Sequence, residues 1–417
     1  MKYMILRTRR NSMNVLECMG VDPMDWFLGD KEVASRLMQM TTIVSQTNDA
    51  GDIRDAFYEV LEPVHDRLPW TFAPLFASGR LSSRMLAREL HWGFRLFAGR
   101  FIGGNDLSSI SRTIRGYHKK KIKVNLDILG DAVFSETEAQ KYVDDYCRLF
   151  SGLPKYGIDA SYDVSASVKI SAAYSQIDPL SLEYSVDMIC DRLEPFFVLA
   201  QKTGFNIFFD ALERDYREIQ LRVFERYYKK YGAIARCVLQ SYTTDSLEII
   251  HRLARLHYRY GDELWVRLVL GAYHSFEQYL AELRGWHVPV WTVKEDTNRN
   301  FRACFIEGIR QGLHMVSGTH NVDHILHALV HGSYETQLIR GMGEPYAEQA
   351  LIPNGLPVRF YVPVLLTSSF AQGIGFLIRR VDDNTGSESF LARFHGKKMK
   401  NAIDILQKGI QALPGRE

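Results

Sequence analysis

Polar and charged side chains stand at the ends of successive apolar runs between residues 122 and 342 of this chain. A purely structural sheet does not need a polar group at nearly every strand end, so we interpret the series as a functional site. Carboxylates, cations and amides gathered in one place suit the binding of an anionic substrate and a polar cofactor. The series comprises Asp127, Lys169, Asp210, Gln240, Arg267, Tyr273, Thr292, Lys294, Thr319, His320, Asn321 and Gln337.

Lys169 lies inside the otherwise apolar run VSASVKISA. Its ammonium group could simply reach solvent at the strand end, bind a substrate carboxylate, or act as a Schiff-base amine. We favour the two functional interpretations. Asp210, in FFDA, either caps the following loop, positions a cofactor or pairs with Lys169.

Two adjacent arginines, Arg379 and Arg380, follow the apolar stretch GIGFLI. Neighbouring helical residues point about 100° apart, so the two side chains can reach different groups of one ligand. A carboxylate is a natural target, with Asp383 one turn later to orient Arg380. Considered alone, Arg379 and Arg380 are better explained as an exposed basic pair than as a carboxylate-binding site. The histidines show no HxH or HExxH spacing, so we expect no metal site.

Short apolar runs alternate with longer amphipathic segments from residue 122 onward. Their starts lie 20 to 42 residues apart, which leaves room for crossover helices between parallel strands. With a further helix at 367–384, the pattern predicts an α/β fold, a (β/α)₈ barrel. An open doubly wound sheet is the alternative, but Gly341-Met-Gly343 lacks its third glycine. The predicted strands are 122–130, 164–172, 205–212, 234–242, 263–273, 288–293, 314–320 and 334–342.

The predicted barrel spans residues 122–390, and residues 1–121 are expected to form a helical arm. Helical apolar spacing recurs there at 31–66 and 81–100, and a basic helix or tail is expected at 391–417. The later part of the arm is basic, which indicates either a solvated face, the favoured interpretation, or a surface for anionic lipid headgroups. The basic residues are Arg84, Arg88, Arg95, Arg100, Arg112, Arg115, Lys119, Lys120, Lys121 and Lys123.

Charge balance, cysteine spacing and the length of apolar runs argue against several classes of protein for this sequence. Lysine plus arginine total 51 and aspartate plus glutamate 49, so charge gives no reason to expect a nucleic-acid binder. Five widely spaced cysteines make a poor disulfide framework and favour reduced thiols in the cytoplasm. No run of 18 apolar residues predicts a membrane-spanning helix.

Taken together, these segments resemble the proline dehydrogenase family, in particular the flavin-binding barrel of the proline utilization A proteins. The similarity runs from FIGGNDLSSISRTIRGYHKKKIKVNLDILGDAVFSETEA (101–139) to SESFLARF (387–394). Between them, in family order, stand VKISA, FFDALE, VLQSY, VRLVLGAY, PVWTVKEDTNRNFRAC, SGTHN, ETQLIRGMGE, VRFYVPV and FLIRR. The resemblance implies an FAD-containing barrel that oxidises L-proline to Δ1-pyrroline-5-carboxylate by hydride transfer to flavin N5. Electrons then pass to a quinone, with peripheral contact at the inner face of the membrane.

The resemblance also assigns roles to residues. Lys169, Arg379 and Arg380 would hold the proline carboxylate, and Arg267 would lie near flavin N5. The proline pocket would be shaped by Asp127, Tyr273, Tyr361 and Phe376. FAD would be bound by Asp210, Val238, Gln240, Arg267, Gly271, Ala272, Lys294, Thr319, His320, Asn321, Gln337 and Asp383. The resemblance implies a catalytic role for five residues, which are Lys169, Arg267, Tyr361, Arg379 and Arg380.

The chain departs from the family pattern at several positions. Leu270 replaces a lysine, His274 a tryptophan and Phe376 a tyrosine. Three alternatives to proline oxidation stay open. They are a flavin-dependent dehydrogenase of hydroxyproline or another cyclic amino acid, a flavin-binding module without turnover, and a Schiff-base aldolase that uses Lys169.

Overall fold

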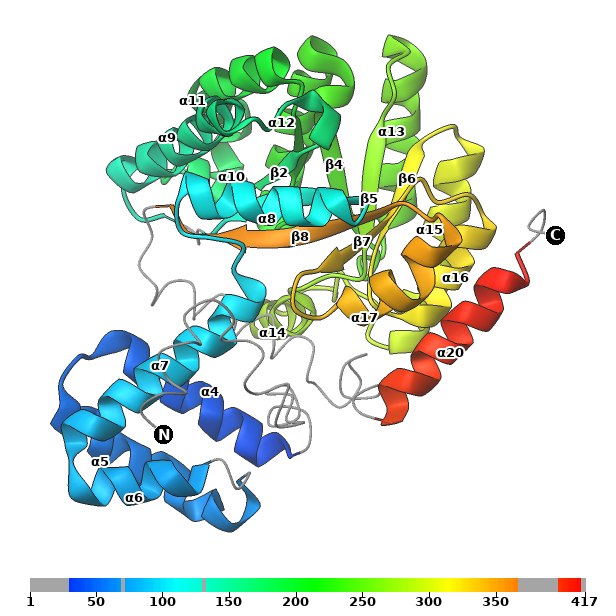
Figure 1. Ribbon diagram of the computed structural model, residues 1–417. Helices are drawn as coiled ribbons and strands as arrows, with labels where there is room; N and C mark the ends of the chain where they lie inside the picture. Colours follow the sequence, from blue (N-terminus) through cyan, green and yellow to red (C-terminus); the bar gives the residue numbers. More distant parts are fainter. Residues whose placement is uncertain (1–29, 69–71, 130–132, 367–396, 414–417) are drawn as a thin grey trace. The chain divides into compact units, whose positions relative to one another are not determined.

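The computed structural model describes residues 30–68, 72–129, 133–366 and 397–413 (Figure 1). Eight parallel strands close into a barrel in chain order, with β8 paired to β1. The predicted (β/α)₈ fold is therefore confirmed. The strands are β1 (Ile122–Ile128), β2 (Ser165–Val168), β3 (Asn206–Phe209), β4 (Ala235–Gln240), β5 (Trp265–Val269), β6 (His314–Gly318), β7 (Thr336–Ile339) and β8 (Val358–Val364).

Helices surround the barrel, and their ends carry the expected signals. Ser135 caps one of them by accepting the N–H of Glu138 at 3.2 Å. Two others end at Gly204 and Gly261, whose φ angles of 72° and 79° suit glycine. The helices are α8 (Leu107–Lys119), α9 (Glu136–Gly152), α10 (Ile170–Ala173), α11 (Leu182–Thr203), α12 (Arg214–Tyr231), α13 (Ser246–Tyr260), α14 (His274–Arg284), α15 (Lys294–Arg310), α16 (Val322–Val330), α17 (Glu344–Tyr346) and α20 (Lys397–Gln411).

The barrel closes through a strand that the apolar pattern did not predict. Strand β8 pairs with β1 along its whole length, from Ile122 opposite Val358 to Ile128 opposite Val364. Arg359 and Pro363 interrupt the apolar character of this segment, which is why periodicity alone overlooks it. In the barrel Arg359 points into the interior, where buried partners satisfy it.

The predicted strand at 288–293 was wrong. This segment links α14 to α15 within the crossover from β5 to β6, and it forms only one antiparallel bridge, between Thr243 and Val290. Two backbone hydrogen bonds hold it beside the loop after β4, from Thr244 N–H to Pro289 and from Trp291 N–H to Tyr242. Its apolar residues therefore cover a loop instead of extending the sheet.

The described residues fall into two compact units, one with residues 30–102 and 397–402 and the other with residues 103–366 and 403–413. The first carries the helical arm, with α4 (Lys31–Gln46), α5 (Ala50–Leu61), α6 (Ala73–Leu81) and α7 (Ser83–Phe101). Helix α8 belongs to the barrel unit, because it packs on β1 and its Tyr117 ring lies 5.0 Å from that of Phe360 in β8. The compact barrel unit thus begins ahead of the boundary expected at residue 121. Within the described ranges no helix is long and apolar enough to cross a membrane.

The basic series at the end of the arm is partly neutralised within the barrel unit. Lys120 forms an ion pair with Glu348 at 2.6 Å, and Lys123 pairs with Asp163 at 2.7 Å. Arg115 donates to the backbone carbonyl of Tyr156. These three side chains therefore have protein partners within the barrel unit.

A buried ion cluster fills the end of the barrel where the strands begin. The side chains of Arg359 and Glu335 are both fully buried and hydrogen-bonded at 2.8 and 3.2 Å. Arg359 also donates to the Asp163 carboxylate at 3.0 Å and to its carbonyl oxygen at 2.6 Å. Burial alone would raise the pKa of Asp163, but Arg359 and Lys123 outweigh it and lower that pKa to about 2.

Replacing Arg359 should strongly destabilise the barrel. Arg359→Met leaves the Glu335 carboxylate buried without its main partner, which typically costs about 3–5 kcal/mol. Urea unfolding of this variant should show that loss in the free energy of unfolding. Arg222→Met, which removes the exposed ion pairs of Arg222 with Glu183 and Glu218, is the matched control and should cost no more than about 1 kcal/mol for each pair. Equal losses in the two variants would contradict the structural role of the cluster.

The same cluster predicts an acid-sensitive component of stability. Because the pKa of Asp163 is depressed in the folded state, its contribution is complete above its ordinary value of 3.8 and is lost as pH falls toward 2. Asp163→Asn keeps a residue that tolerates the observed φ of 47° but removes the titration. The difference in unfolding free energy between wild type and variant should shrink between pH 4 and pH 2. A difference that stays constant over this range would refute the prediction.

Candidate active site

Four buried ionic side chains meet where the barrel strands end. Lys169 directly follows β2, and its ammonium lies 2.8 Å from the Asp127 carboxylate in β1 and 4.0 Å from Asp210 after β3. Arg267 in β5 forms an ion pair with the other oxygen of Asp210. The structure therefore brings together four residues of the predicted site, in an arrangement of two cations and two carboxylates that we call the mouth quartet.

Arg267 and Tyr361 complete the surroundings of Asp210. The Tyr361 hydroxyl donates to Asp210 Oδ2 at 2.9 Å, and the Arg267 guanidinium lies 5.4 Å from the Tyr361 ring centroid. Burial would raise the pKa of the Asp210 carboxyl, but the charges of Arg267 and Lys169 hold it below its usual value. Asp210 is accordingly an anion at neutral pH, and its partners fix it in place.

Lys169 is held in its charged form. Its burial opposes the charge, but the facing Asp127 and Asp210 carboxylates outweigh that effect and raise the pKa of Lys169 above its usual value. A Schiff-base lysine must be neutral to attack a carbonyl, and enzymes normally lower its pKa for that purpose. The geometry therefore favours the anion-binding interpretation of Lys169 over the Schiff-base interpretation.

Gln337 connects the mouth quartet to the buried cluster at the other end of the barrel. Its Oε1 accepts from Arg267 at 3.0 Å, and its Nε2 donates to Glu335 at 2.6 Å. Glu335 in turn binds Arg359. A continuous chain of buried polar contacts thus runs through the barrel interior.

Gln240 links two loops at the mouth through backbone contacts. Its Nε2 donates to the Leu212 carbonyl at 2.8 Å, and its Oε1 accepts from Ala272 N–H at 3.2 Å. The neighbouring Gly271 has a φ of 134°, and a Cβ there would come within 1.5 Å of the Tyr242 ring. The loop at 271–273 therefore requires glycine and is positioned by Gln240.

The segment after β6 presents Thr319, His320 and Asn321. His320 is buried, and its Nε2 accepts the N–H of Ile339 at 3.1 Å. Burial lowers the pKa of His320 to about 4, so the ring is neutral and carries its proton on Nδ1. Asn321 caps α16 by accepting the N–H of Asp323 at 3.0 Å. His320 Nδ1 is thus a fixed hydrogen-bond donor in this segment.

The remaining predicted contacts fall at three positions around the barrel. Val238 is buried in β4 opposite Arg267 of β5. Tyr273 immediately precedes α14, and Lys294 is the first residue of α15, after the segment wrongly predicted as a strand. Phe376, Arg379, Arg380 and Asp383 lie outside the residues that the structure describes.

The sequence-based selection missed several groups that support these side chains. Ser167 accepts a hydrogen bond from Arg267 at 3.1 Å and another from Asn125 at 2.9 Å. The Tyr142 hydroxyl accepts from the backbone N–H of Lys169 at 3.1 Å. Polar residues within an apolar strand, such as Ser165 and Ser167, were the available signal.

Known proteins resemble this chain over most of its length. The family model described as Proline dehydrogenase matches residues 110–393. Bifunctional protein PutA of Salmonella typhimurium is 27% identical over 338 residues, which cover 76% of this chain and 25% of that protein. Proline dehydrogenase 2 of Bacillus subtilis is 23% identical over 317 residues, or 74% of this chain and 93% of the relative.

Solved structures give the same result. The crystal structure of proline utilization A from Bdellovibrio bacteriovorus inactivated by N-propargylglycine has a TM-score of 0.75 and 26% identity, and the match covers 94% of this chain and 41% of that one. The chain thus spans about a quarter of the length of the curated PutA relatives that it matches. Because the family model covers well over half of the sequence, this chain belongs to the proline dehydrogenase family.

Proposed function

We propose that this chain is an FAD-dependent dehydrogenase that oxidises L-proline to Δ1-pyrroline-5-carboxylate. Membership of the family supports the reaction. The observation that supports the proposal most directly is the mouth quartet, in which Asp210 lies beside both the predicted substrate lysine, Lys169, and the predicted flavin-site arginine, Arg267.

The charge balance of the quartet bears on how a substrate carboxylate would bind. Two cations and two carboxylates sum to zero, so a third carboxylate entering this buried region needs further positive charge. The proposed roles of Arg379 and Arg380 supply that charge. Lys169 would then contribute one charge-assisted hydrogen bond to the substrate while Asp127 keeps it oriented.

The residues present fit the polar groups of FAD. The predicted contacts include cationic donors at Arg267 and Lys294, the Nδ1–H of His320, and the tight glycine loop at 271–273. When bound, FAD supplies an acceptor for the hydride that leaves the proline ring. Arg267, fixed by Asp210, Ser167 and Gln337, would place a positive charge where negative charge develops.

Electron transfer to a quinone belongs to the same proposal. The resemblance to proline utilization A proteins supports it, together with a cytoplasmic location and peripheral contact with the inner face of a membrane. This proposal adds no covalent flavin link and no metal.

Anaerobic spectroscopy tests the function directly. Purified protein should carry noncovalent FAD, and L-proline should bleach its visible absorption. Trans-4-hydroxyproline should bleach it more slowly, and its kcat/KM in steady-state assays should be lower than that of proline. The reason is that a buried hydroxyl without a partner costs about 1–3 kcal/mol. Bound FAD that neither substrate bleaches would identify a flavin module without turnover. A higher kcat/KM for hydroxyproline would identify it as the preferred substrate in place of proline. Protein unable to take up FAD would refute the proposal.

Lys169→Met should raise the KM for proline about 10- to 100-fold while FAD remains bound. Loss of one charge-assisted partner of the substrate carboxylate typically costs about 1.5–3 kcal/mol. Lys123→Met is the matched control, since it removes a lysine from the opposite end of the barrel and should leave KM unchanged. Steady-state kinetics and the flavin spectrum report the two effects separately. An unchanged KM in Lys169→Met would remove this residue from the substrate site.

A further inference from the structure

Two buried tyrosines of α9 reach the ends of β1 and β2. Tyr142 and Tyr146 stand one helical turn apart, and their rings meet edge to face with centroids 5.0 Å apart. Both side chains are buried, and their hydroxyl oxygens lie 3.5 Å from each other. The two hydroxyls therefore form a close pair beside the strand ends that carry Asp127 and Lys169.

The Tyr146 hydroxyl lies at the last rung of the β1–β2 ladder, where the paired residues end at Asp127 and Ser167. In a parallel pair of this register, the Ile128 N–H points toward the Ser167 carbonyl. Tyr146 contacts both groups, because its oxygen accepts from the Ile128 N–H at 3.1 Å and its proton is donated to the Ser167 carbonyl. This hydroxyl thus links the two strands at the point where their regular pairing stops.

The Tyr142 hydroxyl takes the next backbone donor of this edge. The Val168 carbonyl accepts the N–H of Asp210, which follows β3, so the Lys169 N–H faces β1 instead. That N–H donates to the Tyr142 hydroxyl at 3.1 Å. Burial raises the pKa of Tyr142 to about 12, so the hydroxyl is neutral at ordinary pH. A side chain of α9 thus holds the backbone of Lys169.

These contacts bear on where the Lys169 ammonium lies. Its 2.8 Å ion pair with Asp127 joins the two strand ends. The tyrosine hydroxyls bind the backbone N–H of Lys169 itself and that of Ile128, the residue after Asp127. A shift of either strand end would move one of the two charged groups, and charged groups serve a site only when they are held close to their productive geometry. The tyrosine pair therefore controls the spacing on which this ion pair depends.

We propose that Tyr142 and Tyr146 are positioning residues, which hold the Lys169 ammonium where it binds the substrate carboxylate. They act through the backbone of Lys169 and Ile128. The inference rests on the proposed function, in which Lys169 binds the carboxylate of proline. It extends the substrate site from the strand ends to a helix that surrounds the barrel.

Tyr142→Phe tests the proposal with little change in side-chain shape. Loss of this hydroxyl should raise the KM for proline about 3- to 10-fold, with a smaller change in kcat and with FAD retained. Tyr227→Phe is the matched control, because Tyr227 is a buried tyrosine of α12 whose hydroxyl donates to the backbone carbonyl of Cys190 at 2.6 Å. The control should lose stability and keep its KM. Tyr146→Phe should also raise KM, and it provides a second test if Tyr142→Phe does not fold.

A double-variant cycle shows whether Tyr142 acts through Lys169. In the Lys169→Met background, Tyr142→Phe should leave the KM for proline unchanged, because the group that it positions is gone. Equal effects in the two backgrounds would indicate a general loss of structure and would overturn the proposal. The same holds if both tyrosine variants fail to fold while the Tyr227→Phe control folds.

Two further outcomes separate this inference from the proposed function. If Lys169→Met raises KM and both tyrosine variants leave it unchanged, the positioning role is overturned and the proposed function stands. If Lys169→Met itself leaves KM unchanged, the substrate role of Lys169 and the positioning role of the tyrosines are both overturned. Steady-state kinetics with proline, together with the flavin spectrum of each variant, distinguishes these outcomes.

Discussion

A chain of buried charges through the barrel interior constrains much of this structure. Charged groups are costly to remove from water unless partners surround them, so each member must be positioned accurately. Lys169, Asp127, Asp210 and Arg267 form one end, and Arg359 with Glu335 forms the other. Gln337 joins them. The strands that carry these residues can satisfy them only once the barrel is closed.

Closing the barrel therefore positions residues of the site as well as completing the fold. Pairing of β8 with β1 places Arg359 opposite Lys123 and Tyr361 opposite Asn125. Tyr361 thereby reaches Asp210, while Arg359 reaches Glu335 and Asp163. The same strand thus stabilises the end of the barrel where the strands begin and orients the Asp210 carboxylate at the mouth. Rigid strands hold these groups, which suits a site whose ligands must meet fixed partners.

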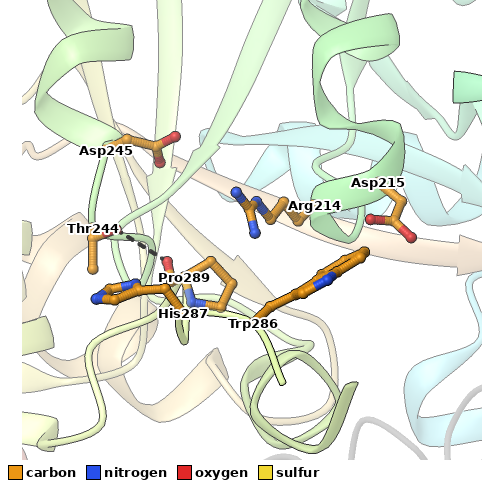
Figure 2. A pocket seen from close by; sticks show the side chains of 7 residues that line it. All are labelled: Arg214, Asp215, Thr244, Asp245, Trp286, His287 and Pro289. Carbon is orange, nitrogen blue, oxygen red and sulfur yellow. Dashed lines mark hydrogen bonds between the residues drawn. The ribbon is translucent and has the colours of Figure 1, made fainter. Parts of the chain in front are cut away.

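Loops that follow the strands also form a pocket outside the mouth quartet (Figure 2). The crossover from β5 to β6 contains α14 and then an irregular segment that lies beside the loop after β4. This path places Trp286 near Arg214, which belongs to a helix 72 residues earlier in the chain. The segment 288–293, wrongly predicted as a strand, thus contributes Pro289 to the wall of this pocket.

The sequence by itself determined the barrel class, seven of the eight strands, and which residue types gather at strand ends. These features depend on local apolar periodicity, glycine at helix ends and polar residues at strand ends. Only the tertiary structure decided that 358–364 closes the barrel and that 288–293 does not join it. In the local pattern Arg359 only interrupts an apolar run, because its partners Glu335 and Asp163 lie far away in sequence. The pairing of Lys169 with Asp127, and hence its charge state, is likewise a long-range electrostatic effect.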